Sequence, residues 1–233
     1  MSPHLTKPQY WFAAGAITTT LVALAVARWL PIAGETALLV TINQQWASPW
    51  ADKFFIWISE RETFTAPLLL LILAVLIKNH GLNGLKLWGL LALAITLGDQ
   101  LGNLFKELFS QPRPCAVIFD LIRQPKHPAG GSCGAMTTGT PSSHALNFFL
   151  TATFLGLTLR SLRWFTPLLL IAIAVGLSRI YLGVHYPSQV VLGSMLGVLM
   201  GAATACLCRR YLPFISVMQP GPKPAAAERT ENC

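Results

Sequence analysis

The chain has 233 residues, of which 53% are hydrophobic and only 11% are charged, and its mean hydropathy is +0.54. A water-soluble domain needs a larger charged surface, so this composition excludes an ordinary soluble globule and indicates a membrane protein. The net charge of +8 contains no dense basic stripe with interleaved aromatic residues, so no nucleic-acid partner is expected.

Six apolar runs are each long enough to cross about 30 Å of hydrocarbon as a helix. They begin near Trp11, Thr65, Leu87, Ala145, Phe165 and Val190. The first run, Trp11 to Leu30, has no small-residue cleavage site followed by a soluble domain, so it is interpreted as an uncleaved span. The predicted fold is an all-α integral membrane six-helix bundle.

Two segments outside the spans have a different composition. Residues 31–63 mix charged residues with tryptophans and phenylalanines, which is typical of an interfacial helix whose rings lie at headgroup level. Residues 213–233 have little to bury and are predicted as a disordered cytoplasmic tail. Residues 1–212 are predicted as one domain.

Basic residues in the short connections predict the orientation of the chain. With the N-terminus inside, the positive-inside bias is satisfied by Lys78, Lys86, Arg160, Arg163, Arg209 and Arg210. Both termini are then cytoplasmic, and the short loops favour a bacterial inner membrane. Residues 106–144 and 179–185 fall together on the periplasmic face, where their basic residues violate the bias and need a local reason.

The cysteines leave two possibilities open. Cys115 and Cys133 lie in the long polar connection from Ser110 to Thr140, where they either form a disulfide bond or remain two free thiols. Cys206, Cys208 and Cys233 have no histidine cluster nearby, so no zinc site is expected.

Two short motifs flank that connection. In KELFSQPRP, Lys106 precedes Arg113 and Pro114 where the third span ends, and the prolines stop the helix and hold the two cations near one point. Taken alone, such cations are more often interfacial anchors. In PSSH, which ends at His144, a proline and two serines form a helix start whose unpaired N–H groups suit an anion.

The third motif is SRIYLGVHYPSQ, which ends the fifth span and begins the sixth. An arginine inside an apolar segment is costly without a purpose, and Arg179 lies six residues before His185. Gln189 lies one helical turn beyond His185 and can reach back to hold an imidazole nitrogen.

Together the motifs bring three cations, an anion-ready helix start and two histidines to one membrane face. A phosphoryl group uses all of them, because its oxygens need cations while its transfer needs an in-line nucleophile and an acid. The carboxylates are too scattered for a magnesium site, so neither a metal nor another cofactor is expected.

The three motifs resemble those of the type 2 phosphatidic acid phosphatase superfamily, K-x6-R-P, P-S-G-H and S-R-x5-H-x3-D. There are two departures. Ser143 replaces the glycine of the second motif, which keeps the backbone N–H and adds a hydroxyl. Gln189 replaces the aspartate of the third, so it can orient His185 but supplies no charge.

The resemblance implies a mechanism. His185 attacks phosphorus to form a phosphohistidine, and His144 protonates the departing lipid group and later activates water. Lys106, Arg113, Ser142, Ser143 and Arg179 bind the phosphoryl oxygens. The lipid tail is expected to stay in the bilayer, so no deep tail pocket is required.

Several substrates and activities remain open. The motif details are most similar to polyprenyl diphosphatases, which favours undecaprenyl diphosphate as the substrate. Phosphatidylglycerophosphate, phosphatidic acid and a lipid A phosphate also present a phosphate on an apolar anchor. A lipid phosphotransferase is a second catalytic possibility, and a non-enzymatic lipid-phosphate binder or transporter is a third reading. The sequence leaves the oligomeric state undetermined.

Overall fold

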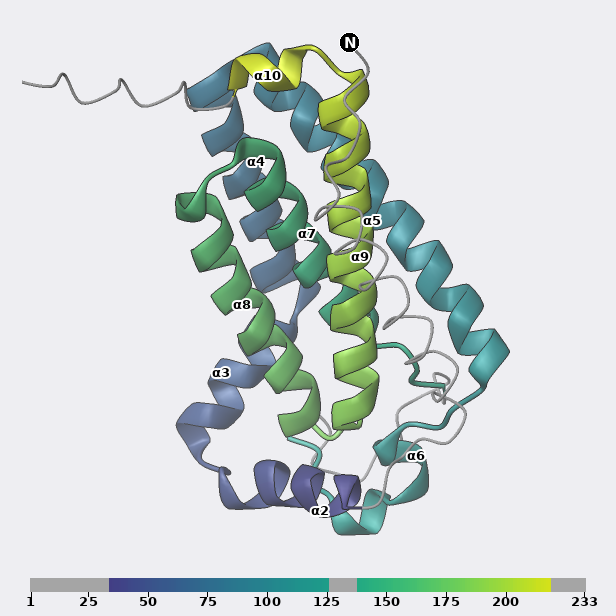
Figure 1. Ribbon diagram of the computed structural model, residues 1–233. Helices are drawn as coiled ribbons and strands as arrows, with labels where there is room; N and C mark the ends of the chain where they lie inside the picture. Colours follow the sequence, from purple (N-terminus) through teal and green to yellow (C-terminus); the bar gives the residue numbers. More distant parts are fainter. Residues whose placement is uncertain (1–33, 126–137, 219–233) are drawn as a thin grey trace, which may run out of the picture.

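The computed structural model describes residues 34–125 and 138–218, and Figure 1 shows these parts as a bundle of helices. The helices are α2 (Glu35–Val40), α3 (Pro49–Ser59), α4 (Ala66–His80), α5 (Leu82–Phe109), α6 (Pro114–Val117), α7 (Ser143–Leu159), α8 (Leu162–Tyr181), α9 (Pro187–Tyr211) and α10 (Phe214–Met218). Two π-helical turns, Thr41–Gln45 and Arg61–Thr65, follow α2 and precede α4, and a 3-10 turn spans Phe119–Leu121. The prediction of an all-α fold is thus confirmed for the described part of the chain.

The helices match the predicted spans in position. Each of the five later spans begins within a helix or the turn that leads into it, while Trp11 to Leu30 lies outside the described residues. Within residues 34–125 and 138–218, three helical segments are long and apolar enough to cross a membrane, namely Arg61–His80, Leu162–Tyr181 and Pro187–Tyr211. Helix α7 is apolar but has only 17 residues.

Helix α7 lies at the centre of the bundle, packed against α9, α8 and α5. Its contact with α9 is close because Gly193, Gly197 and Gly201 recur every fourth residue along one face of α9. A Cβ at any of these positions would collide with a backbone carbonyl of Ser142, Leu146 or Leu150 respectively. The glycines therefore allow the two helix backbones to touch.

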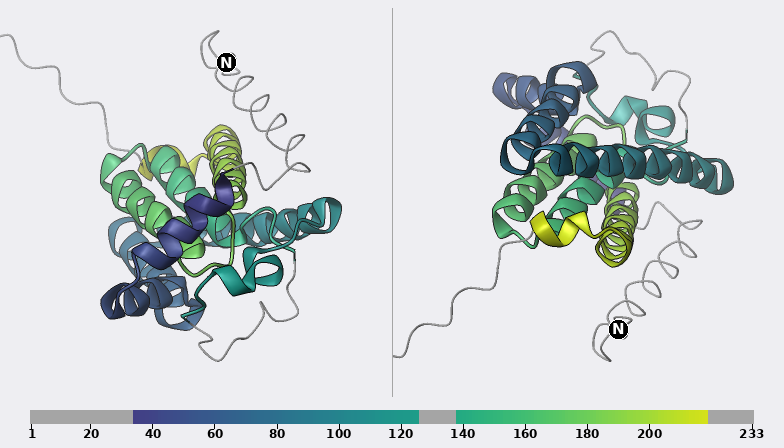
Figure 2. Two further views of the ribbon diagram at one scale, coloured as in Figure 1. Left: turned by 90° about the horizontal axis from the view of Figure 1, so that it is seen from below. Right: turned by 90° about the horizontal axis from the view of Figure 1, so that it is seen from above.

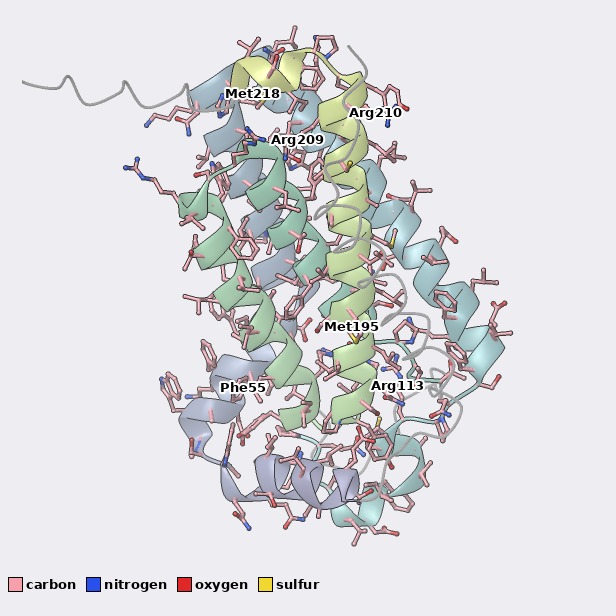
Figure 3. The ribbon with its side chains drawn as sticks, in the orientation of Figure 1. Phe55, Arg113, Met195, Arg209, Arg210 and Met218 are labelled. Carbon is pink, nitrogen blue, oxygen red and sulfur yellow. The ribbon has the colours of Figure 1, made fainter. Side chains whose placement is uncertain are left out.

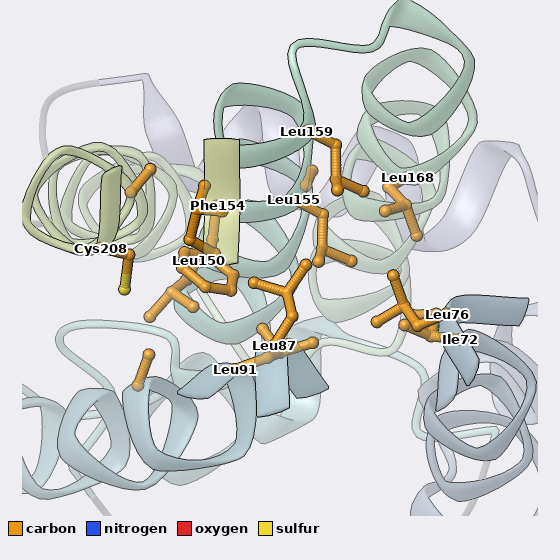
Figure 4. Close-up of a cluster of buried hydrophobic side chains, with 14 of the residues drawn as sticks. Ile72, Leu76, Leu87, Leu91, Leu150, Phe154, Leu155, Leu159, Leu168 and Cys208 are labelled. Carbon is orange, nitrogen blue, oxygen red and sulfur yellow. The ribbon is translucent and has the colours of Figure 1, made fainter. Parts of the chain in front are cut away.

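A leucine-rich core fills the space between α7 and the helices around it. Figure 4 shows Leu150, Phe154 and Leu155 of α7 meeting Leu87 of α5 and Leu76 of α4. The labelled side chains are almost fully buried, with exposed fractions between 0% and 3% except for Leu168 and Cys208 at 6%. Burial on this scale anchors α7 relative to its neighbours.

One end of the bundle gathers basic residues. Arg209 and Arg210 lie there together with α10 (Figure 3), and Lys86 lies over the ring of Phe214 at 5.6 Å from its centroid. Helix α10 also corrects the predicted domain boundary at residue 212. Two of its side chains, Ile215 and Met218, are buried in the core, so the folded part extends at least to Met218.

The opposite end carries α2 and α3, which lie across the ends of α8 and α9 (Figure 2). A polar network fixes them there. Asn43, which is 0% exposed, donates to the carbonyls of Tyr181 and Arg123 at 2.7 and 2.9 Å. Asp52 accepts from Arg123 at 2.7 Å and from the Tyr181 hydroxyl at 2.5 Å. The expected interfacial segment is therefore helical, and its position at headgroup level stays a prediction.

Candidate active site

All three motifs lie at the end of the bundle that carries α2 and α3. The first motif is at the end of α5 and in the segment after it, the second begins α7, and the third joins α8 to α9. Figure 3 labels Arg113 at this end, remote from Arg209 and Arg210. Helix direction explains the convergence, because α5 and α8 end where α7 and α9 begin.

Hydrogen bonds join the motifs in pairs. The Nζ of Lys106 donates to the Ser143 hydroxyl at 2.5 Å, which links the first motif to the second. The Nε2 of Gln189 donates to the Pro112 carbonyl at 3.0 Å, which links the third to the first. The Ser142 N–H donates to the Gln189 carbonyl at 3.0 Å, so the second and third are also joined. The hydroxyl that Ser143 adds to the motif therefore holds Lys106.

Gln189 fixes the orientation of the His185 ring. The two side chains are 1% and 2% exposed, and His185 Nδ1 lies 3.1 Å from Gln189 Oε1. The same oxygen accepts from the Tyr186 N–H at 3.2 Å, and the amide nitrogen is engaged with Pro112, so the amide has one consistent orientation. An amide oxygen only accepts, so Nδ1 carries the proton and Nε2 is left as the basic nitrogen.

The electrostatic environment of His185 is strongly positive. Burial, followed by the charges of Arg113 and Arg179, holds the pKa of His185 well below its usual value, although the bond to Gln189 acts in the opposite direction. Burial also lowers the pKa of Arg113. The charge of His144 also acts on His185, which indicates that the two imidazoles lie in the same region of the molecule.

Ser59, at the end of α3, contacts two of the predicted site residues. Its carbonyl lies 3.3 Å from His144 Nε2, and because a carbonyl accepts, this ring nitrogen is the donor. Its hydroxyl accepts from Arg179 Nη1 at 3.0 Å and lies 2.6 Å from the Ser178 hydroxyl. Ser59 thus holds the second histidine and the third cation relative to each other.

The segment after α5 folds back on the stretch that leads into α7. Arg113 Nε donates to the Thr138 carbonyl at 3.0 Å, and the Gly139 N–H donates to the Gln111 carbonyl at 2.7 Å. A side chain at Gly139 would collide with Gln189 and Arg113. Glycine is therefore needed here for close packing of the first and third motifs.

Some buried polar atoms in this region make no hydrogen bond with any described residue. They include the hydroxyls of Ser142 and Thr140 and the Nε of Arg179. Ser142 and Thr140 are 0% exposed, so an unmet hydrogen bond at either is costly. A hydroxyl and a guanidinium N–H beside two cations suit a tetrahedral oxyanion.

A cavity of about 290 Å³ adjoins the site. Ser143 and His144 belong to its lining, together with apolar residues of α4, α5, α7 and α8 such as Leu69, Ile95 and Leu168. Further polar residues, among them Arg61, Asp99 and Asn147, also line it. No feature of the sequence predicted this cavity, and the expectation that the lipid tail needs no deep pocket stays a prediction.

Four residues near the site were missed in the sequence: Ser59, Arg61, Gly139 and Asn147. The charge of Arg61 acts on both Lys106 and His144, and Arg61 lines the cavity with Asn147. No local pattern distinguishes Ser59 or Arg61 from the surrounding aromatic and charged residues. Asn147 was predictable, because it lies one turn after His144 in a helix whose later residues are apolar except for three threonines.

Cys115 forms a disulfide bond, whereas Cys206 and Cys208 are free. Its partner therefore lies outside the described residues, and pairing with Cys133 stays a prediction. Alkylation of a Cys133→Ser variant tests it, because Cys115 should then react without reductant.

The fold and the site define a membrane lipid phosphatase. Residues 87–212 match the PAP2 superfamily, and the chain belongs to this family, which confirms the resemblance seen in the motifs. It is 32% identical over 169 residues to the lipid A 4'-phosphatase of Bacteroides thetaiotaomicron, covering 70% of this chain and 72% of that one.

Two solved structures share the fold. Aquifex aeolicus LpxE has a TM-score of 0.58 and 27% identity, covering 75% of this chain and 96% of its own. A transmembrane PAP2 type phosphatidylglycerolphosphate phosphatase from Bacillus subtilis has a TM-score of 0.61 and 20% identity, covering 87% and 98%. At 20% identity the second likeness is one of fold alone.

Proposed function

We propose that this protein hydrolyses the terminal phosphate of a membrane lipid through a phosphohistidine on His185. The observation that carries the proposal is the hydrogen-bonded arrangement of His185, in which Gln189 holds Nδ1–H and leaves Nε2 free beside two arginines. A neutral imidazole with a free nitrogen is the form that can attack phosphorus.

In the first step, Nε2 of His185 forms a bond to phosphorus as the bond from phosphorus to the lipid oxygen breaks. His144 supplies a proton to that oxygen, so the lipid leaves in neutral or singly protonated form. Lys106, Arg113 and Arg179 neutralise the phosphoryl oxygens, and the Ser142 hydroxyl and nearby backbone N–H groups add hydrogen bonds.

In the second step, water attacks the phosphohistidine. His144, now neutral, takes a proton from the water as the phosphorus–nitrogen bond breaks, and inorganic phosphate is released. The proton balance closes, because His144 recovers the proton that it gave to the leaving group.

Two lipid classes are candidates for the substrate. The motif details favour a polyprenyl diphosphate, with undecaprenyl diphosphate as the specific case. The similarity to a lipid A 4'-phosphatase favours a phosphorylated glucosamine lipid. Both present a terminal phosphate to the site from an apolar anchor that remains in the bilayer.

We also propose that the site faces the periplasm and that both termini are cytoplasmic. The cluster of Lys86, Arg209 and Arg210 at the far end supports this orientation by the positive-inside bias. The disulfide at Cys115 supports it too, because disulfides persist in oxidising compartments.

The experiment measures phosphate release by the detergent-purified protein from undecaprenyl diphosphate, phosphatidic acid and lipid A, with EDTA present. We expect release from at least one lipid, loss of release in His185→Ala, and an acid-labile phosphoenzyme in the wild type. His80→Ala is the matched control, because His80 lies at the opposite end of α4 from the site. Undiminished release by His185→Ala would falsify the proposal, and binding without turnover would favour a lipid-phosphate binder. Phosphate found on a lipid acceptor instead of in solution would indicate a phosphotransferase.

A further inference from the structure

The wall of the cavity beside the site contains a hydrogen-bonded pair of polar side chains, Asp99 and Asn147. Asn147 Nδ2 donates to Asp99 Oδ1 at 2.8 Å, and both residues line the cavity. The Asn147 Oδ1 is buried and makes no hydrogen bond with any described residue. An unmet buried acceptor costs free energy, so this atom is suited to a ligand that brings a donor.

The pair lies deeper in the bundle than the phosphate site. Asn147 follows His144 by three residues, which is one turn of α7 or about 4.5 Å along its axis. Asp99 precedes Lys106 by seven residues, which is about 10 Å along α5. A substituent that reaches the pair must therefore lie a few bonds from the phosphorus. It belongs to the leaving group, which His144 protonates.

Near Asp99 and Asn147, the cavity wall presents hydrogen-bond acceptors but few hydrogen-bond donors. The Thr151 hydroxyl donates to the Asn147 carbonyl at 2.8 Å, so its proton is already used. Arg61 is a donor, but its charge acts on Lys106 and His144 at the phosphate end. The remaining lining near the pair includes Leu69, Ile95 and Leu168, which provide no hydrogen bonds.

We propose that this cavity binds the part of the lipid next to the phosphate, and that Asp99 and Asn147 accept a hydrogen bond from a hydroxyl or amide N–H there. The preferred substrates are then lipid phosphates with a donor close to the phosphate, as in glucosamine-based or hydroxylated lipids. The isoprene units of a polyprenyl diphosphate offer no such donor. The inference rests on the proposed function and selects between its two candidate substrate classes.

The size of the cavity agrees with this role. At about 290 Å³ it lies near the lower end of the range for ligand pockets, roughly 300–1,000 Å³, so it admits the region beside the phosphate but not a whole lipid. Arg61 and Ala66 in its lining are exposed, so the cavity reaches the outer surface of the bundle. The rest of the chain can leave there into the bilayer.

The test compares two substrates that differ in one donor, lysophosphatidic acid and its 2-O-methyl ether. We expect the wild type to favour the free hydroxyl in kcat/KM by on the order of tenfold, since hydrogen bonds to charged groups contribute about 1.5–3 kcal/mol. The double variant Asp99→Leu with Asn147→Leu should lose this preference while still hydrolysing the ether, which shows that it is folded. Should the double variant lose all activity, the milder Asn147→Leu alone should reduce the preference.

The matched control is Thr96→Val, a polar-to-apolar change on α5 outside the cavity, whose hydroxyl already donates to the Ala92 carbonyl. It should keep the wild-type preference. Equal rates on both substrates, or a preference that survives removal of the polar pair, would overturn the inference and leave the proposed function intact. Phosphate release from undecaprenyl diphosphate but from neither lysolipid would also overturn it. No release from any lipid would count against both proposals.

Discussion

Gln189 uses every polar atom of its side chain in the site. Its oxygen accepts from His185 and Tyr186, and its nitrogen donates to the Pro112 carbonyl. An aspartate here would restore a charge near His185 but has no N–H for Pro112. Gln189 differs from the aspartate of the family motif, but all of its polar side-chain atoms have hydrogen-bond partners in the site.

Replacing Gln189 with methionine should lower kcat roughly tenfold or more, with little change in KM. The apolar side chain keeps the volume but leaves the His185 ring unheld and its tautomer unfixed, while the phosphate-binding cations remain. Steady-state kinetics on the best lipid substrate measures the split. Gln100→Met, at an exposed position of α5, is the control and should behave as wild type. A large rise in KM at constant kcat would assign Gln189 to substrate binding instead.

The depressed pKa of His185 predicts the acidic side of the pH profile. The nucleophile must be neutral, and burial with Arg113 and Arg179 keeps it neutral below its ordinary pKa of about 6.5. The limb of the pH profile on which His185 becomes protonated should therefore lie below pH 6.5. The dependence of kcat/KM on pH, measured from about pH 4 to about pH 8, tests this prediction. An acidic limb centred above about 6.5 would contradict the assignment.

At the scale of elements, the contact between α7 and α9 sets the position of the second motif relative to the third. Gly197→Ala should destabilise the fold by about 1–3 kcal/mol, because its Cβ would collide with the Leu146 carbonyl. Gly89→Ala is the matched control on α5, where a Cβ meets nothing within 4 Å. Both changes alter helix propensity in the same favourable direction.

Thermal unfolding of the two variants in detergent separates packing from propensity. A lower midpoint for Gly197→Ala beside an unchanged or higher midpoint for Gly89→Ala is the expected pair of results. Equal midpoints would show that the α7–α9 contact is not tight.

The positions of the helices were predictable from hydropathy, because apolar runs of sufficient length have few alternatives in a membrane. Their mutual packing was not predicted, although one signal was present. Glycine recurs at every fourth residue, at Gly193, Gly197 and Gly201, and this spacing indicates close helix contact. The buried part of α10 was missed because it is only five residues long and follows a proline.

At the scale of the whole molecule, the motifs predicted which side chains would meet but not what supports them. Lys106, Arg113, His144, Arg179 and His185 were identified by spacing, and the structure brings them to one end. Their supports come from distant parts of the chain, because Ser59 lies 85 residues before His144 and 120 before Arg179. Such contacts depend on the tertiary fold and leave no local trace.

The short length of α7 has a consequence for where the reaction occurs. Seventeen residues span about 25 Å, less than the roughly 30 Å of a typical hydrocarbon layer. A phosphate that reaches the start of α7 must then sink below the level of neighbouring headgroups, or the bilayer must thin around the protein. Membrane thickness should therefore regulate turnover, with faster hydrolysis in vesicles of shorter-chain lipids than in thicker ones at equal substrate density. A rate indifferent to chain length would mean that the catalytic end is already level with the headgroups.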